Sequence, residues 1–233
     1  LTDKYIFGCV ARNQGRKNLP ENIESFCEFA KDKPDVLLIM HSDPVDPAAV
    51  CNLQDLADRT GQGHKILWTG MRMATPFTTT TIRELYNLFD CFYLTTSGEG
   101  FGVPFIESMS CEVPVIATDF TTTKELITDH NAGLGIKLMG ENKRPYPAEG
   151  QFLNGTITGT WEVGRGFCDK YDSVDKLNYA YNNREKMREL GKYGRRAMIQ
   201  HYDFDTVVGP AFLRFFKEIS ENRKIIDLTQ VTT

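Results

Sequence analysis

The stretch Ser97–Pro114, S-G-E-G-F-G-V-P-F-I-E-S-M-S-C-E-V-P, is the most informative part of this chain. It follows Cys91-Phe92-Tyr93-Leu94, an apolar run typical of a buried parallel strand. Three glycines then alternate with other residues and permit a sharp turn that a ligand can approach closely. Pro104 suits the first turn of the helix that comes next. The stretch therefore predicts a strand, a glycine-rich loop and a short helix.

Two carboxylates frame this loop, Glu99 before it and Glu107 in the first turns of the helix. A helix N-terminus after a glycine-rich turn presents free N–H groups and a positive dipole end, which suits phosphate. Because a carboxylate repels phosphate, these two residues are better suited to accept hydrogen bonds from neutral sugar and ribose hydroxyls. The alternative is a simple glycine turn with a glutamate that the helix dipole favours.

The sequence on both sides of this stretch alternates between apolar runs and amphipathic segments. Strands are expected at 5–11, 36–40, 65–68, 91–94, 113–117 and 133–138, with helices between them, including one over 48–59. This alternation predicts an α/β fold, a Rossmann-like open parallel sheet with helices on both faces. Ligands bind such sheets at the carboxyl ends of the strands. The cationic loop 12–17 and the loop with Glu99 and Glu107 both leave such ends, so we expect them at one cleft.

The region 140–168 interrupts the alternation. It is rich in glycine and has no long apolar run, so we expect an excursion that is either functional or partly ordered, and we favour a surface insertion without a catalytic role. After two further helical segments, 204–219 predicts a helix with Val207, Val208, Phe212, Phe215 and Phe216 buried on one side. We expect one domain over 1–221, with the excursion at 140–168, and a frayed tail at 222–233.

Composition excludes several classes of protein. The 233 residues are 41% apolar and 25% charged, with a net charge of −4, so no global basic field favours nucleic acid. No apolar run approaches the ~20 residues of a transmembrane span. None of the six cysteines forms a C-x-x-C pair, and the four histidines lack metal-ligand spacing. We therefore expect a cytoplasmic protein with reduced thiols, no metal site and no nucleic-acid partner.

The spacing E-x7-E around G-F-G-V-P-F-I resembles the donor-site motif of retaining glycosyltransferases with the GT-B fold, the family 4 or group 1 type. The resemblance extends over Tyr5–Ile219, apart from the excursion. In that family the first Glu lies beside the transferred sugar and the second binds the ribose of the nucleotide, which implies these roles for Glu99 and Glu107. The donor-binding loop between them comprises Gly100, Phe101, Gly102 and Val103.

The resemblance also assigns roles to the cationic loop. The family has an Arg after the first strand and a Lys five residues later, which Arg12 and Lys17 match. These cations neutralise the diphosphate of the donor without a metal ion. The family often has Gly after that Lys, where this chain has Asn18. Arg16 receives no role and is interpreted as a solvated charge.

The resemblance implies the donor-binding half of a two-domain enzyme that lacks its N-terminal acceptor domain. The expected reaction transfers a sugar from a nucleotide-diphosphate sugar to an acceptor hydroxyl, with retention at the anomeric carbon. The expected partners are that donor, with GDP-mannose favoured over a UDP-sugar, and a carbohydrate or lipid-linked acceptor. A non-catalytic nucleotide-sugar-binding module remains an alternative, as does a sugar-nucleotide epimerase on the same architecture. A phosphorylase is a weaker candidate, because no lysine stands in a context typical of pyridoxal phosphate.

Overall fold

The computed structural model describes residues 3–47, 49, 51–70, 77–146, 152–153, 156–157 and 161–222. The strands are β1 Tyr5–Val10, β2 Val36–His41, β3 Ile66–Trp68, β4 Cys91–Leu94, β5 Val115–Thr118, β6 Gly133–Ile136, β7 Leu138–Tyr146, β8 Phe152–Leu153, β9 Thr156–Ile157 and β10 Trp161–Cys168. The α-helices are α1 Leu19–Ala30, α2 Leu53–Arg59, α3 Thr79–Tyr86, α4 Val103–Ser110, α5 Lys170–Asn182, α6 Arg184–His201 and α7 Gly209–Asn222. Short 3-10 helices are η1 Gly15–Lys17 and η2 Gly63–Lys65, and π-helical turns are η3 Lys124–Thr128 and η4 Phe204–Val208.

Six strands form one parallel sheet in the order β3-β2-β1-β4-β5-β6. The chain winds outward from β1 to β3 and then returns to the other side of β1 with β4. The direction of winding therefore reverses between β1 and β4, which makes the loops after these two strands the expected ligand site. The Rossmann-like open parallel sheet predicted from the sequence is confirmed.

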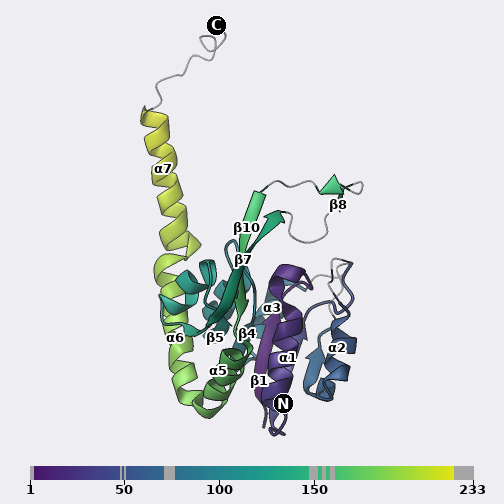
Figure 1. Ribbon diagram of the computed structural model, residues 1–233. Helices are drawn as coiled ribbons and strands as arrows, with labels where there is room; N and C mark the ends of the chain where they lie inside the picture. Colours follow the sequence, from purple (N-terminus) through teal and green to yellow (C-terminus); the bar gives the residue numbers. More distant parts are fainter. Residues whose placement is uncertain are drawn as a thin grey trace.

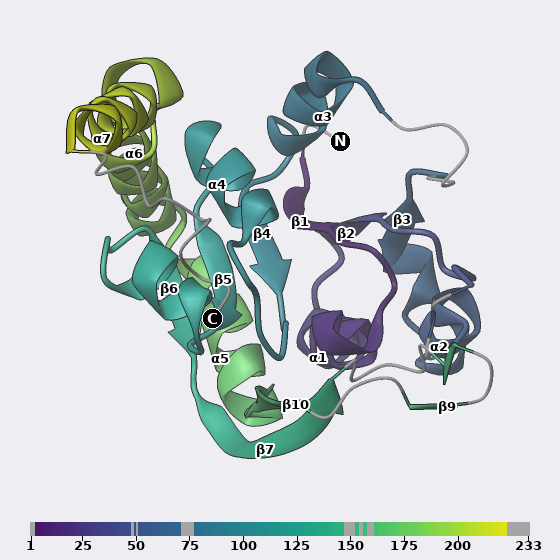
Figure 2. The same ribbon diagram turned by 90° about the horizontal axis from the view of Figure 1, so that it is seen from above.

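Helices cover both faces of the sheet (Figure 2). One face carries α1, α2 and α5, with α1 packed against both of the others, and the opposite face carries α3, α4 and α6. The apolar strand sequences explain this arrangement, because every residue of β4 and β5 is buried. Aromatic rings fill the space under α1, where Phe7 of β1 lies 5.4 Å from Phe29, measured between ring centroids.

The second helix begins later than the sequence predicts. The expected helix over 48–59 starts at Leu53, because Asn52 acts as the N-cap and its side chain accepts hydrogen bonds from the N–H groups of Gln54 and Asp55. Residues 48 and 50 lie outside the described part of the chain. The extended conformation of Asn52 ends the preceding loop.

The excursion at 140–168 contains regular structure. β7 and β10 pair in antiparallel register, with Trp161 opposite Tyr146 and Cys168 opposite Leu138, and they extend beyond the body of the domain (Figure 1). This two-stranded ribbon shows that part of the expected excursion is ordered. Its strands carry mixed polar and apolar residues, so they give no clear apolar run in the sequence.

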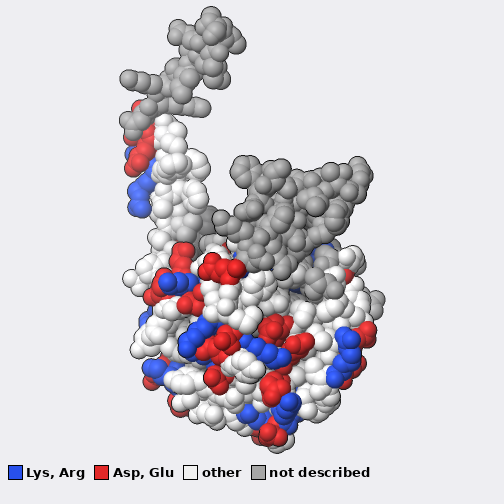
Figure 3. Space-filling view, in the orientation of Figure 1, with Lys and Arg blue, Asp and Glu red and all other residues white. Residues whose placement is uncertain are grey.

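The last helix has an exposed apolar face, which contradicts the prediction that this face is buried. Phe212, Phe215 and Phe216 are 54%, 54% and 60% exposed, and Val207 and Val208 in η4 are partly buried. α7 extends away from the sheet (Figure 1), and much of this arm is uncharged on the face shown in Figure 3. No element among the described residues covers these rings. Of the predicted frayed tail, 222–233, Asn222 ends α7 and the remaining residues lie outside the described part of the chain.

Candidate functional site

The loop after β1 is fastened to the loop after β4 by hydrogen bonds. Ser97 donates from its N–H to the carbonyl oxygen of Arg16 at 2.7 Å, and its hydroxyl donates to the same oxygen at 2.9 Å. The hydroxyl of Thr95 donates to the carbonyl oxygen of Asn18 at 2.9 Å. The expectation that these two loops meet at one edge of the sheet is confirmed.

Asn18 holds a backbone conformation that few residues tolerate. Its φ of 51° and ψ of 40° place it in the left-handed region, between η1 and α1. Glycine adopts this region freely and asparagine is among the few other residues that visit it routinely. Asn18 therefore preserves the local geometry at the position where the resemblance predicts glycine.

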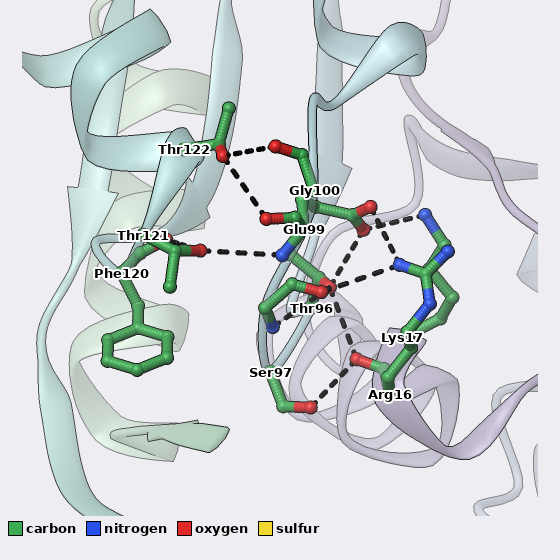
Figure 4. A network of polar contacts seen from close by, with 10 residues as sticks. Arg16, Lys17, Thr96, Ser97, Glu99, Gly100, Phe120, Thr121 and Thr122 are labelled. Carbon is green, nitrogen blue, oxygen red and sulfur yellow. Dashed lines mark hydrogen bonds and ion pairs between the residues drawn. The ribbon is translucent and has the colours of Figure 1, made fainter. Parts of the chain in front are cut away.

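Glu99 lies at the centre of a buried group of charges (Figure 4). Its Oε1 lies 2.6 Å from Nζ of Lys17, and its Oε2 lies 2.7 Å from Nη1 of Arg16. The hydroxyl of Thr96 donates to Oε1 at 2.9 Å. The side chains of Glu99 and Lys17 are 4% and 7% exposed, while that of Arg16 is 32% exposed. The interpretation of Arg16 as a solvated charge is therefore wrong, because it is paired with Glu99.

Burial and ion pairing have opposite effects on these charges. Burial by itself would raise the pKa of Glu99, but the charges and hydrogen bonds of Lys17 and Arg16 outweigh it and lower that pKa. Burial lowers the pKa of Lys17, because the charged amine loses hydration. The attraction of Glu99 offsets this loss only in part, since Lys17 shares that carboxylate with Arg16. The group of three carries one net positive charge.

The loop that follows Glu99 is held from the other side by Thr122. Its hydroxyl lies 3.1 Å from the carbonyl oxygen of Glu99 and 2.8 Å from that of Gly100 (Figure 4). Among the described residues, nothing accepts a hydrogen bond from the backbone N–H groups of Gly100, Phe101, Gly102 and Val103. The anchored carbonyls and the unpaired N–H groups make this loop suited to an anionic ligand.

Gly102 starts α4 in the left-handed region, at φ 84°. A Cβ at this position would lie 2.8 Å from the ring of Phe105, so the tight turn requires glycine. Phe101 and Val103 beside it are 55% and 52% exposed. The turn thus directs two apolar side chains outward at the start of the helix.

Glu107 lies one turn further along α4 and has a buried partner. The hydroxyl of Tyr86, from α3, donates to Oε2 of Glu107 at 2.9 Å. Tyr86 is fully buried, and its pKa is raised by burial and by the adjacent Glu107 carboxylate. This contact could not be predicted, because a tyrosine on the apolar face of a helix is normally interpreted as a core residue.

Arg12 forms a separate ion pair. Its Nε and Nη2 lie 2.9 Å and 3.1 Å from the two carboxylate oxygens of Asp46, a bidentate arrangement. Asp46 is buried, whereas the side chain of Arg12 is 40% exposed. Of the three residues predicted as catalytic, Lys17 and Glu99 are therefore in contact, and Arg12 is paired with Asp46.

Two kinds of feature, a metal-binding cluster and a membrane-spanning helix, are absent from the described residues. No group of three or more His, Cys, Asp and Glu side chains in the described part of the chain is arranged to hold a metal ion. Within the same residues, none of the helices has both the length and the apolar character needed to cross a membrane.

The chain is similar to several known proteins in sequence and in fold. The chain is 26% identical over 141 residues to the lipopolysaccharide core biosynthesis mannosyltransferase LpsB of Rhizobium meliloti, a match over 60% of this chain and 38% of that protein. The C-terminal domain of the group 1 glycosyl transferase LpcC from Francisella tularensis has a TM-score of 0.63 and 19% identity, over 86% of this chain and 87% of that one. The structure of Anabaena HepE in complex with UDP has a TM-score of 0.66 and 16% identity, over 92% of this chain and 49% of that one.

These solved structures are domains of GT-B glycosyltransferases, and the likeness shows that this chain has the same fold. The chain spans less than half the length of the curated relatives it matches. The family model for glycosyl transferases group 1 matches residues 1–138, which include β1 to β6 and all of the site residues described above. Because that match covers more than half of the sequence, the chain belongs to the glycosyl transferases group 1 family.

Proposed function

We propose that this chain is the donor-binding half of a retaining glycosyltransferase, which transfers a sugar from a nucleotide-diphosphate sugar to an acceptor hydroxyl. The observation that carries the proposal is the contact of Lys17 and Arg16 with Glu99, between the loops after β1 and β4 where the winding of the sheet reverses. This group has one positive charge in excess, beside a loop whose N–H groups lack acceptors. Such a site suits a diphosphate next to a sugar hydroxyl.

The residues have distinct roles in this proposal. Lys17 and Arg12 stabilise the negative charge that grows on the leaving diphosphate, as cationic clamps do in other group transfers. Glu99 accepts a hydrogen bond from the transferred sugar, and Glu107 accepts hydrogen bonds from the ribose. The backbone of Gly100, Phe101, Gly102 and Val103 holds the diphosphate. Retention then requires no enzyme nucleophile, since the leaving phosphate assists the acceptor hydroxyl on the same face.

The donor is a nucleotide-diphosphate sugar, bound without a metal ion. Anabaena HepE is in complex with UDP, which supports a nucleotide donor. The relative from Rhizobium is named a mannosyltransferase, which favours GDP-mannose. A UDP-sugar is the alternative. A thermal-shift screen of UDP-, GDP- and ADP-sugars separates these donors, because a ligand that binds only the folded state raises the melting temperature.

The acceptor site belongs to a second domain in this proposal. The relatives are longer than the matched region, and the exposed apolar face of α7 provides a surface for a preceding acceptor domain of the same polypeptide. The acceptor is a carbohydrate or a lipid-linked sugar. Catalysis needs the acceptor hydroxyl to be held against the anomeric carbon, which one open half of a cleft does not achieve.

An assay of nucleotide release, with and without acceptors, tests this proposal. We expect the 233-residue chain to bind a nucleotide diphosphate and to hydrolyse the donor slowly at most. The full-length polypeptide should transfer the sugar with retained anomeric configuration, which NMR of the product measures. Robust acceptor-dependent turnover by the 233 residues alone would refute the half-enzyme proposal. Nucleotide binding without any transfer by the full-length polypeptide would favour a non-catalytic module.

A further inference from the structure

The ribbon formed by β7 and β10 is attached directly to the loop that carries Glu99. Almost all of this ribbon lies beyond residue 138, where the match to the family model ends. Gly166 of β10 donates its N–H to the carbonyl oxygen of Ser97 at 3.0 Å. A Cβ on Gly166 would lie 2.8 Å from both Leu138 and the ring of Phe120, so the base of the ribbon is tightly packed. Its position relative to the site is therefore well defined.

This packing brings Arg165 to the site. Gly98 has a φ of 151°, in the range that favours glycine, and a Cβ there would lie 3.3 Å from Nη1 of Arg165. The Nε atom of Arg165 is buried and has no hydrogen-bond partner. Buried polar groups are normally paired, so an unpaired guanidinium nitrogen is an unusual feature beside the Gly98 turn.

Arg16 approaches the same turn of the backbone. Its Nη1 lies 3.4 Å from the carbonyl oxygen of Gly98, so two arginines that are distant in sequence approach the same turn. Arg16 and Lys17 share Glu99 as their carboxylate, and Arg165 forms no ion pair with any described residue. Arg165 thus lies beside the turn at Gly98, next to a group of Arg16, Lys17 and Glu99 that already carries one net positive charge. Because like charges repel in a partly buried site, this excess favours a bound anion.

We propose that Arg165 and Arg16 form an anion subsite at the base of the ribbon, which binds a phosphate or carboxylate group of a substrate. Arg165 donates hydrogen bonds from its guanidinium to this group, and Arg16 adds charge from its position beside the carbonyl oxygen of Gly98. The subsite is additional to the loop at the start of α4. That the anion belongs to a substrate rests on the proposed function. The group is either the diphosphate of the donor or an anionic group of the acceptor.

Isothermal titration calorimetry of the full-length polypeptide tests the subsite, with inorganic phosphate, UDP and GDP as probes. We expect Arg165→Met to weaken the binding of at least one of these anions about tenfold. Arg165→Lys should weaken the binding of the same anion less. Arg188→Met removes a charge from an exposed ion pair in the first turns of α6 and should change none of the affinities. The melting temperature of Arg165→Met without anions should not fall, since the variant removes an unpaired buried donor.

The pattern of loss identifies the source of the anion. Weaker binding of UDP or GDP, with unchanged binding of uridine and guanosine, assigns the anion to the donor diphosphate. Weaker binding of inorganic phosphate to protein saturated with UDP or GDP assigns it to the acceptor. If neither nucleotide binds and phosphate binding still depends on Arg165, the donor-binding proposal fails and the subsite stands.

Two results would overturn the subsite. One is that phosphate, UDP and GDP all bind Arg165→Met within twofold of the unaltered protein. The other is that the unaltered protein binds none of them. If Arg165→Met does not fold, Arg165→Gln replaces it in the same titrations, because it keeps a polar side chain of similar length.

Discussion

Neutralising Glu99 should leave Lys17 as a buried charge without a partner. The variant Glu99→Gln keeps the shape of the side chain and removes its negative charge. The side chain of Lys17 is 7% exposed, and its Nζ lies 2.6 Å from the Glu99 carboxylate. The side chain of Arg16 is 32% exposed and can turn to water. We therefore expect most of the destabilisation to arise at Lys17.

The contact distance sets the magnitude of this effect. Unit charges 2.6 Å apart attract by about 6 kcal/mol at an effective dielectric constant of about 20. Burying each ion costs several kcal/mol, so the intact pair contributes little net stability, whereas loss of one partner costs about 3–5 kcal/mol. In a domain of this size that corresponds to a fall of about 6–20 °C in melting temperature. The double variant Lys17→Met/Glu99→Gln should regain most of this loss.

The pH dependence of stability provides an independent signature. Burial lowers the pKa of Lys17, and removal of Glu99 should lower it further. Between that lowered pKa and the ordinary value of 10.5, the unfolded chain binds a proton that the folded chain does not. The stability of Glu99→Gln should therefore rise with pH through this window. In the unaltered protein, the lowered pKa of Glu99 contributes stability that is present above its ordinary 4.5 and is lost as the pH falls through the folded value.

Urea denaturation followed by circular dichroism, repeated from about pH 3 to about pH 10, measures these effects. The set comprises the unaltered chain, Glu99→Gln, Lys17→Met, the double variant and the control Glu189→Gln. Glu189 is 59% exposed and pairs with Lys186, so its loss should cost less than about 1 kcal/mol. A loss of less than about 1 kcal/mol in the free energy of unfolding of Glu99→Gln would refute the reasoning. It would also be refuted if the double variant lost as much stability as the two single variants together.

Three further predictions follow from the site and from α7. Glu107→Ala should weaken nucleotide binding, measured by calorimetry, about tenfold, since hydrogen bonds to a charged group contribute about 1.5–3 kcal/mol. The control Tyr86→Phe keeps the carboxylate of Glu107 and should weaken nucleotide binding much less. EDTA should leave the activity of the full-length polypeptide intact, and a strict need for manganese or magnesium would contradict this. The double variant Phe212→Ser/Phe216→Ser should lower the melting temperature of the full-length polypeptide and not that of the 233-residue chain, in which both rings are exposed; equal shifts in both would contradict an interface on α7.

The sheet could be predicted because its strands are buried on both faces. Runs such as Cys91–Leu94 are entirely apolar, and such runs separated by helical segments indicate parallel strands. The ribbon of β7 and β10 could not be predicted in this way, because the sequences of its strands mix charged residues, glycine and aromatic residues without a continuous apolar run. The apolar periodicity of α7 identified a face of the helix correctly. Periodicity does not reveal whether another element covers that face, so the expectation of burial was wrong.

The charged site depends on contacts between residues that are far apart in the chain. Arg16 and Lys17 are adjacent in a 3-10 turn, where successive side chains point in directions about a third of a turn apart. Both reach Glu99 because its two oxygens face different partners, across sequence separations of 83 and 82 residues. The resemblance to the family selected Lys17, five residues after Arg12, and could not reveal the second contact. Arg16 enters the site because Ser97 holds its carbonyl oxygen, so its participation is a consequence of how the loops after β1 and β4 are tied together. A variant that loosens this tie should therefore release Arg16 from Glu99 before it affects the buried Lys17.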